Sequence, residues 1–332
     1  MRHLLFWLYV LWLFSALRAS AVAPQSLMSD TDIVHPNKVN VEAWAEANKE
    51  KFVPPICNKL LHKQKNLNVM FVGGPNTRTD FHLDEGSEFF FQLKGDIELP
   101  TVQQGKRKLV KINEGEVFLL PSRVPHSPQR PNEGSFGLVV ERERTEQEMD
   151  GLRWYTDFEK CDDILWERFF RCENLGKDLV PVVQAFKASQ ECASGVPSET
   201  SVVKPEDRPI KQDMTTVVPD PFRLSDWLEA NRAELDNGAA LNLFPGHPDK
   251  EFTVEVVGGG AAGTTAELDD IPDERWLYQL EGAATVTNLE TNEVTVLDQG
   301  DCCILTHNSK CSVARAAGSI GLAVRQNPLG NK

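Results

Sequence analysis

The chain has 332 residues, of which 41% are hydrophobic, so it is long enough for two compact domains and apolar enough to bury a large core. Its net charge of −14 would repel a phosphate backbone, and no Lys- and Arg-rich run with interleaved aromatic residues offsets that charge. This composition excludes a disordered chain and argues against nucleic acid as a partner.

The first 27 residues have the layout of a secretory signal peptide. A short basic start precedes an apolar stretch from Leu4 to Leu17, and small residues in an A-x-A-like pattern follow it. This stretch is shorter than the roughly 20 apolar residues that a transmembrane helix needs, so we predict no stable membrane span. Met28 would serve equally well as the start of a chain without the leader, which leaves the true N-terminus and the compartment open.

The next elements predict a β-rich module flanked by helices. Residues 41–52 are amphipathic with a helical period, whereas short apolar runs between residues 67 and 142 are divided by Gly, Pro and Asn. The second pattern is typical of an antiparallel sandwich or barrel. Residues 150–186 return to helical spacing, and we expect helices there that cover the barrel. Residues 187–216 are rich in Ser, Pro and charge, which predicts a linker.

The region after residue 216 weakly repeats the first half. The segment "FFFQLKGDIEL" is similar to "WLYQLEGAATV", "INEGEVFLLP" to "LDQGDCCILT", and "AWAEANKEKF" to "DWLEANRAEL". We therefore predict an all-β dominated fold of two helix-plus-barrel modules at 28–186 and 217–332, joined by the linker.

Polar residues in the first module form two clusters about forty residues apart. Asp80, His82 and Glu88 precede the apolar run "FFFQL", and His126 and Arg130 make up the second cluster. Burying such side chains is costly without a partner, and a metal ion would be one. Two imidazoles and one carboxylate form the facial triad of non-haem Fe(II) oxygenases, and His82, Glu88 and His126 supply that set.

The repeat serves as an internal control on this site. Alignment through "YQLEG" places Asp269 opposite His82 and Arg275 opposite Glu88, and Cys311 falls opposite His126. None of these three positions keeps the ligand type of the first module. We predict chemistry in the first module and a metal-free, degenerate scaffold in the second.

The two clusters resemble the two cupin motifs, so the resemblance implies two double-stranded β-helix barrels, a bicupin. The sequence reads Gly74-x5-Asp80-x-His82-x5-Glu88-x6-Gly95 and then Gly115-x5-Pro121-x-Arg123-x2-His126-x3-Arg130. Asp80 stands at the place of the first motif histidine, and Arg130 stands where the motif has Asn. The usual four-ligand set is thereby reduced to two His and one Glu.

Longer segments resemble the 3-hydroxyanthranilate 3,4-dioxygenase family in its single-chain, two-cupin form. These segments are "VPPICNKLLH", "MFVGGPNTRTDFH", "VFLLPSRVPHSPQRP" and "GLVVERER". The resemblance implies an Fe(2+) enzyme that opens the ring of 3-hydroxyanthranilate with O2 to 2-amino-3-carboxymuconate semialdehyde. This product closes to quinolinate, a precursor of NAD in the kynurenine pathway of tryptophan catabolism. The resemblance also implies a cytoplasmic protein, whereas the signal-like leader would direct the chain to the secretory pathway. A two-cupin chain is expected to be a monomer.

The resemblance also assigns roles to residues around the metal. It places Arg130 at the substrate carboxylate, Arg78 on the O2 side, and Glu141 at the substrate amino group, where it could accept or return a proton. Glu88 borders the substrate as well as the iron. Taken singly, such arginines and glutamates more often form ordinary ion pairs, and only the family pattern gives them these roles. A cupin dioxygenase of another phenol or of a thiol, and a non-catalytic bicupin binding or storage protein, are the alternatives.

Overall fold

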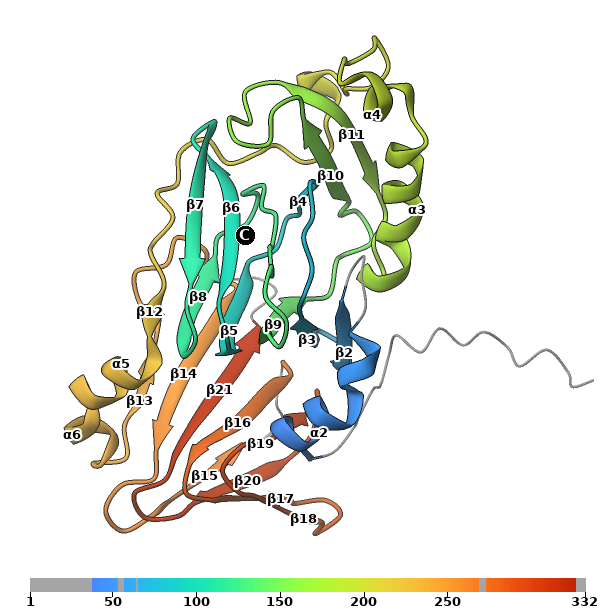
Figure 1. The fold of residues 1–332 in the computed structure, drawn as a ribbon. Helices are drawn as coiled ribbons and strands as arrows, with labels where there is room; N and C mark the ends of the chain where they lie inside the picture. The colour runs from blue at the N-terminus through green and yellow to red at the C-terminus, as the bar shows by residue number, and fades with distance from the viewer. Residues whose placement is uncertain (1–37, 53–56, 64, 269–272, 327–332) are drawn as a thin grey trace, which may run out of the picture. The chain divides into compact units, whose positions relative to one another are not determined.

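A computed structural model of the chain describes residues 38–52, 57–63, 65–268 and 273–326 (Figure 1). The signal-like leader at 1–27 and the alternative start at Met28 lie outside the described residues. No helix among the described residues is long and apolar enough to cross a membrane.

The first module pairs a six-stranded antiparallel sheet with smaller sheets across a buried interior. The order of the large sheet is β12-β8-β5-β9-β3-β2, and the facing strands form the sheets β11-β10-β4 and β6-β7. The strands are β2(Asn58–Lys63), β3(Leu67–Gly73), β4(Phe81–Leu83), β5(Glu88–Lys94), β6(Ile97–Gln103), β7(Lys106–Ile112), β8(Glu116–Leu120), β9(Phe136–Arg142), β10(Asp150–Tyr155), β11(Ile164–Phe170) and β12(Phe222–Arg223). Met70, Phe90, Leu99, Phe118 and Val139 belong to the apolar cluster between the large sheet and the β6-β7 ribbon.

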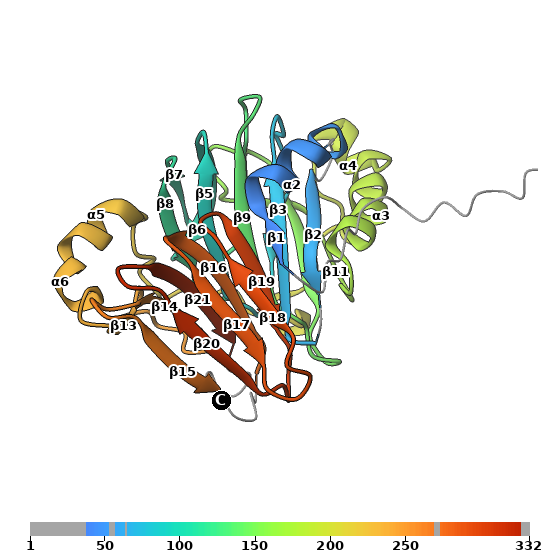
Figure 2. The same ribbon diagram turned by 90° about the horizontal axis from the view of Figure 1, so that it is seen from below.

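The second module repeats this plan. Its large sheet has the order β1-β19-β16-β21-β14-β13, and its smaller sheet has the order β15-β20-β17-β18 (Figure 2). The strands are β1(Val39–Asn40), β13(Ala240–Asn242), β14(Phe252–Gly258), β15(Thr264–Leu268), β16(Arg275–Glu281), β17(Ala284–Asn288), β18(Val294–Leu297), β19(Asp301–Leu305), β20(Cys311–Arg315) and β21(Ile320–Gln326).

Alternation along β5 explains how the two large sheets pack on each other. Phe90 points into the interior of the first module, whereas Phe89 and Phe91 join a cluster that contains Val254 and Trp276 of the second module. Successive side chains of a strand face opposite sides, so Glu88 shares the inward side with Phe90. Burial of each large apolar side chain in this cluster contributes about 1.5–3 kcal/mol.

Two short strands are exchanged between the modules. β1, near the start of residues 28–186, pairs with β19 of the second module, and β12, near the start of residues 217–332, pairs with β8 of the first. Each exchange adds a backbone connection to the apolar contact between the large sheets.

Helices lie at the ends and edges of the strands. They are α2(Val41–Asn48), α3(Leu175–Lys187), α4(Gln190–Ser194), α5(Leu224–Ala230) and α6(Arg232–Leu235), with short 3₁₀ helices at Lys49–Lys51 and Pro205–Asp207. Asn174 caps α3 by accepting a hydrogen bond from the backbone N–H of Lys177. Phe186 of α3 stacks on Trp154 with ring centroids 4.1 Å apart, which fastens the helix to β10.

The predicted helices over residues 150–170 are wrong. Residues 150–155 and 164–170 form β10 and β11, and the helix α3 begins only at Leu175. Every residue of β10 is buried, so the strand shows no alternation that would reveal it in the sequence. Pairing with β4 on one edge and β11 on the other decides the conformation of this segment.

The segment predicted as a linker follows the first module closely. Arg208 forms an ion pair with Glu167 of β11 at 2.8 Å, and the backbone oxygen of Ser201 accepts a hydrogen bond from the N–H of Glu167. Gln212 accepts a hydrogen bond from Arg153 of β10. These polar contacts order the segment, and its role as the boundary between modules stays a prediction.

Candidate metal centre and active site

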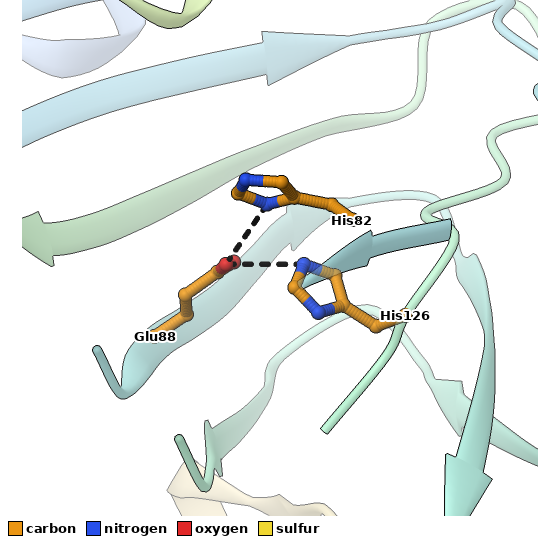
Figure 3. A group of neighbouring side chains, drawn as sticks. All are labelled: His82, Glu88 and His126. Carbon is orange, nitrogen blue, oxygen red and sulfur yellow. Dashed lines mark ion pairs between the residues drawn. The ribbon is translucent and has the colours of Figure 1, made fainter. Parts of the chain in front are cut away.

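The structure brings together the three residues predicted as metal ligands (Figure 3). His82 lies on β4, and His126 lies on the neighbouring segment, where the two residues exchange backbone hydrogen bonds of 2.8 and 3.0 Å. Glu88 is the first residue of β5 and reaches the two imidazoles from the opposite sheet. The triad therefore connects the large sheet of the first module with the β11-β10-β4 sheet.

The ligand atoms of the triad converge on one carboxylate oxygen. Glu88 Oε1 lies 3.0 Å from His126 Nε2 and 3.7 Å from His82 Nδ1, and all three side chains are buried. No hydrogen bond with acceptable geometry reaches Glu88 Oε1. A buried carboxylate oxygen without a donor is costly, and a metal ion among these three groups would remove the cost. The donor set of two imidazoles and one carboxylate fits Fe(II) and leaves coordination positions open.

Electrostatics in this site hold protons on the imidazoles while no metal is bound. Burial opposes the charged form of His82, but the hydrogen bond to Asp150 and the nearby carboxylate of Glu88 raise its pKa to about 10. Burial likewise opposes ionisation of Glu88, yet His126 and His82 lower its pKa. Because a metal needs neutral imidazole ligands, metal binding must release protons from this cluster.

Arg130 is a buried cation, and it lines a cavity together with the triad. The cavity is lined by the triad, Arg78, Arg130, Glu141 and apolar side chains that include Met70, Phe90, Val139 and Leu179. Arg130 is 2% exposed and contacts the carbonyl oxygen of Val72 and the side-chain oxygen of Gln92, both at 3.3 Å. Burial lowers its pKa to about 10, and no carboxylate of the described residues forms an ion pair with it. A buried guanidinium of this kind is suited to an anionic group of a ligand.

Comparison with known proteins identifies the family of the chain. The sequence profile described as 3-hydroxyanthranilic acid dioxygenase matches residues 33–187 and 216–332. The rat protein named 3-hydroxyanthranilate 3,4-dioxygenase is 40% identical over 294 residues, covering 89% of this chain and 98% of the relative. The relative of that name from Nematostella vectensis is 42% identical and covers 87% of this chain and 99% of its own length. The chain belongs to the 3-hydroxyanthranilic acid dioxygenase family.

A solved structure confirms the fold of this family member. Salicylate 1,2-dioxygenase from Pseudaminobacter salicylatoxidans superposes with a TM-score of 0.55 at 14% identity, covering 97% of this chain and 93% of that one. At that identity the similarity establishes the fold alone. The predicted all-β dominated bicupin fold is confirmed.

Arg78 and Asp80 pair with each other beside the triad. Arg78 Nε lies 3.1 Å from Asp80 Oδ1, and an Nη atom of the same guanidinium binds the other carboxylate oxygen. Asp80 is therefore engaged by Arg78, although it stands where the cupin motif has its first histidine. Arg78 itself lines the cavity, as its predicted place on the O2 side requires.

Glu141 adjoins Glu88 and belongs to a network that the sequence analysis missed. Arg144 binds Glu141 at 2.5 Å, Asp84 at 3.0 Å and Asp150 at 2.9 Å. Burial raises the pKa of Glu141, against the lowering effect of Arg144. The oxygens of Asp84, Glu88 and Glu141 lie close enough to hold an ion, but Arg144 already binds two of these three carboxylates.

Asp150 and Arg144 contact the predicted site residues, but no sequence pattern marked them as part of the site. Asp150 Oδ2 lies 2.7 Å from His82 Nε2, and Arg144 Nε binds the other oxygen of Asp150 at 3.1 Å. Arg144 stands inside the quoted segment "GLVVERER", but only the pairing of β10 with β4 brings Asp150 to His82.

The described residues of the second module include no comparable group. Among the described residues, the clusters able to hold a metal ion all lie in the first module. Arg275 pairs in register with Arg325, where the first module has Glu88 beside Glu141, and Cys311 is buried. Asp269, aligned with His82, lies outside the described residues. A metal-free second module therefore stays a prediction.

Proposed function

We propose that the chain is an Fe(2+)-dependent ring-cleaving dioxygenase that converts 3-hydroxyanthranilate and O2 to 2-amino-3-carboxymuconate semialdehyde. Family membership supports the reaction, since the relatives matched over most of this chain carry the name of that enzyme. One observation in the chain itself carries the assignment. Arg130 is a buried arginine with no ion pair to a carboxylate among the described residues, and it shares a cavity with a buried triad of two His and one Glu.

The triad of His82, Glu88 and His126 would hold the iron. Ferrous iron in such a site supplies open positions for the substrate and dioxygen and a route for electrons between them. The Oε1 atom of Glu88 supports this assignment, because it lies between the two imidazoles and no hydrogen bond of acceptable geometry reaches it. Glu88 also borders the space left for the substrate.

Arg130 would bind the substrate carboxylate. A guanidinium fork matches a planar carboxylate through two parallel hydrogen bonds. Val72 and Gln92 hold the guanidinium in place, so it does not have to be ordered when the substrate arrives. The apolar side chains that line the same cavity, such as Met70 and Phe90, keep water away from the aromatic ring.

Glu141 would bind the substrate amino group and exchange a proton with it. Its raised pKa favours a carboxylate that can accept a proton and later return it. Arg78 would lie on the dioxygen side of the cavity, where its positive charge stabilises negative charge that develops on oxygen. Asp80 fixes the direction of this guanidinium.

The remaining parts of the proposal concern the surroundings of the enzyme. The product would close to quinolinate and feed NAD synthesis. A monomer agrees with the extensive contact between two modules of one chain. The cytoplasm is the compartment that the family resemblance favours.

An activity assay on Fe(II)-loaded protein tests the proposed function. The full chain is loaded anaerobically with Fe(II) and then given 3-hydroxyanthranilate in air while the absorbance of the ring-opened product is followed. We expect product from the loaded protein and none after chelation of the iron. Iron binding without product would redirect the assignment to a cupin dioxygenase of another phenol or of a thiol. Absence of iron binding would favour a bicupin binding protein.

A further inference from the structure

The second module contributes carboxylates to the end of the large sheet at which Glu88 and Glu141 lie. Glu251 and Glu274 are 3% and 1% exposed, and Asp249 is half-buried. Each of the three binds backbone N–H groups of the first module. Buried carboxylates are costly unless hydrogen-bonded, so these contacts define the geometry of the interface.

Glu251 contacts the neighbours of both catalytic glutamates. Its Oε1 atom accepts a hydrogen bond of 2.5 Å from the backbone N–H of Ser87, and Ser87 immediately precedes Glu88. Its Oε2 atom lies 2.8 Å from Nε of Arg142, and Arg142 immediately follows Glu141. One carboxylate of the second module therefore joins the start of β5 to the end of β9.

The segment that leads into Glu251 fixes the next strand. Asp249 Oδ2 accepts hydrogen bonds from Ser87 Oγ at 2.8 Å and from the backbone N–H of Ser122 at 2.6 Å. His247 Nε2 lies 3.0 Å from the carbonyl oxygen of Leu119. Ser122 follows β8, the strand in which Leu120 pairs directly with Glu88.

Glu274 holds a fourth strand at the same end of the sheet. Its two carboxylate oxygens accept hydrogen bonds from three successive backbone N–H groups, those of Lys65, Asn66 and Leu67. Leu67 begins β3 and pairs in register with Arg142 of β9. The neighbouring strands β8, β5, β9 and β3 are thus all bound at the end where Glu88 and Glu141 lie.

We propose that segment 247–251, together with Glu274, is a positioning element for the active site. By fixing the peptides that flank Glu88 and Glu141, it holds both carboxylates at the angle from which they enter the cavity. This inference rests on the proposed function and gives the metal-free module a part in iron binding. Residues that orient ligands from outside the first coordination sphere typically change metal affinity 10- to 100-fold when they are replaced.

The test compares Fe(II) affinity and stability in full-length variants. Glu251→Gln keeps the size of the side chain and removes its charge, and Glu251→Ala removes the contact altogether. Asp301→Asn is the matched control, because Asp301 is a 4% exposed carboxylate of the same module that binds Lys38, Asn40 and the N–H of Asp298. Fe(II) dissociation constants come from anaerobic chelator competition, and thermal unfolding of each metal-free protein is recorded alongside.

We expect Glu251→Gln to raise the dissociation constant about tenfold or more, with Asp301→Asn unchanged within twofold. Hydrogen exchange at the Ser87 and Glu88 amides of the metal-free protein should be faster in Glu251→Gln and unchanged in the control. Glu251→Gln with a lower melting temperature but unchanged affinity and exchange would overturn the inference and leave the proposed function intact. If Glu251→Ala does not fold, Glu251→Gln alone decides. Wild-type protein that binds no Fe(II) would overturn the proposed function and this inference together.

Discussion

His82 Nε2 lies 2.7 Å from the Oδ2 atom of Asp150, although 68 residues separate the two in the chain. The contact exists because β10 pairs with β4, with Leu152 opposite His82. The same carboxylate is bound by Arg144, which also binds Glu141. A single buried network therefore connects an imidazole proposed to bind the metal with the glutamate proposed to bind the substrate.

Replacement of Asp150 by Ala should weaken iron binding. The imidazole of His82 would lose the partner that fixes its orientation, and Arg144 would lose one of its acceptors. Loss of such an outer partner typically costs 10- to 100-fold in metal affinity. Chelator competition measures the effect, and Asp150→Asn separates the charge from the hydrogen bond. Equal affinity in wild type and Asp150→Ala would show that Asp150 does not orient His82.

Replacement of Arg130 by Ala should impair substrate binding and leave the iron in place. A hydrogen bond to a charged group contributes about 1.5–3 kcal/mol, which corresponds to a rise in KM of about 10- to 150-fold. Iron content and steady-state kinetics should be measured on the same preparation. Arg130→Lys keeps the charge but not the fork and should recover only part of the loss. Wild-type KM in Arg130→Ala would refute the assigned role.

Fe(II) affinity should increase as the pH rises through neutrality. The carboxylates of Asp150 and Glu88 raise the pKa of His82 to about 10, so below that pH its imidazole must lose a proton before it can bind metal. Each proton displaced makes the apparent association constant grow with pH. Anaerobic titrations at pH 6, 7 and 8 measure the slope, and an affinity independent of pH would contradict protonated imidazoles in the metal-free site.

Replacement of Phe89 by Ala should destabilise the protein. Phe89 does not line the cavity that contains the triad. Phe89 is fully buried in the cluster between the large sheets, and truncation of a buried Phe costs about 3–5 kcal/mol. Urea denaturation measures the change, with Leu289→Ala as the control, because Leu289 is 40% exposed. A loss below about 1 kcal/mol for Phe89→Ala would argue that the modules do not share a core.

The sequence was sufficient to predict that the residues of the triad lie together, because their residue types and spacing form local patterns. His82 and Glu88 lie within seven positions of each other, and the cupin motif relates them to His126. Arg130 was also predictable from its place four residues after His126. For Arg78, Arg130 and Glu141 the structure places all three side chains at the cavity, and their roles stay predictions.

Contacts that depend on strand pairing or on the interface between modules could not be predicted from the sequence. β10 is buried on both faces, so its residues carry no period-two signal that would separate the strand from a helix. Without β10 in place, nothing relates Asp150 to His82. Glu251 is a single acidic residue 164 positions from Ser87, and no local pattern marks such a pair.

The ratio of oxygen to substrate consumed tests the central claim most directly. With Fe(II)-loaded wild-type protein in an oxygen electrode, we expect one O2 taken up for each 3-hydroxyanthranilate opened and no release of hydrogen peroxide. The His126→Ala protein, shown by its thermal transition to be folded, should take up no oxygen. Uptake that persists in His126→Ala, or a wild-type protein that consumes no oxygen with iron bound, would contradict ring cleavage at this triad.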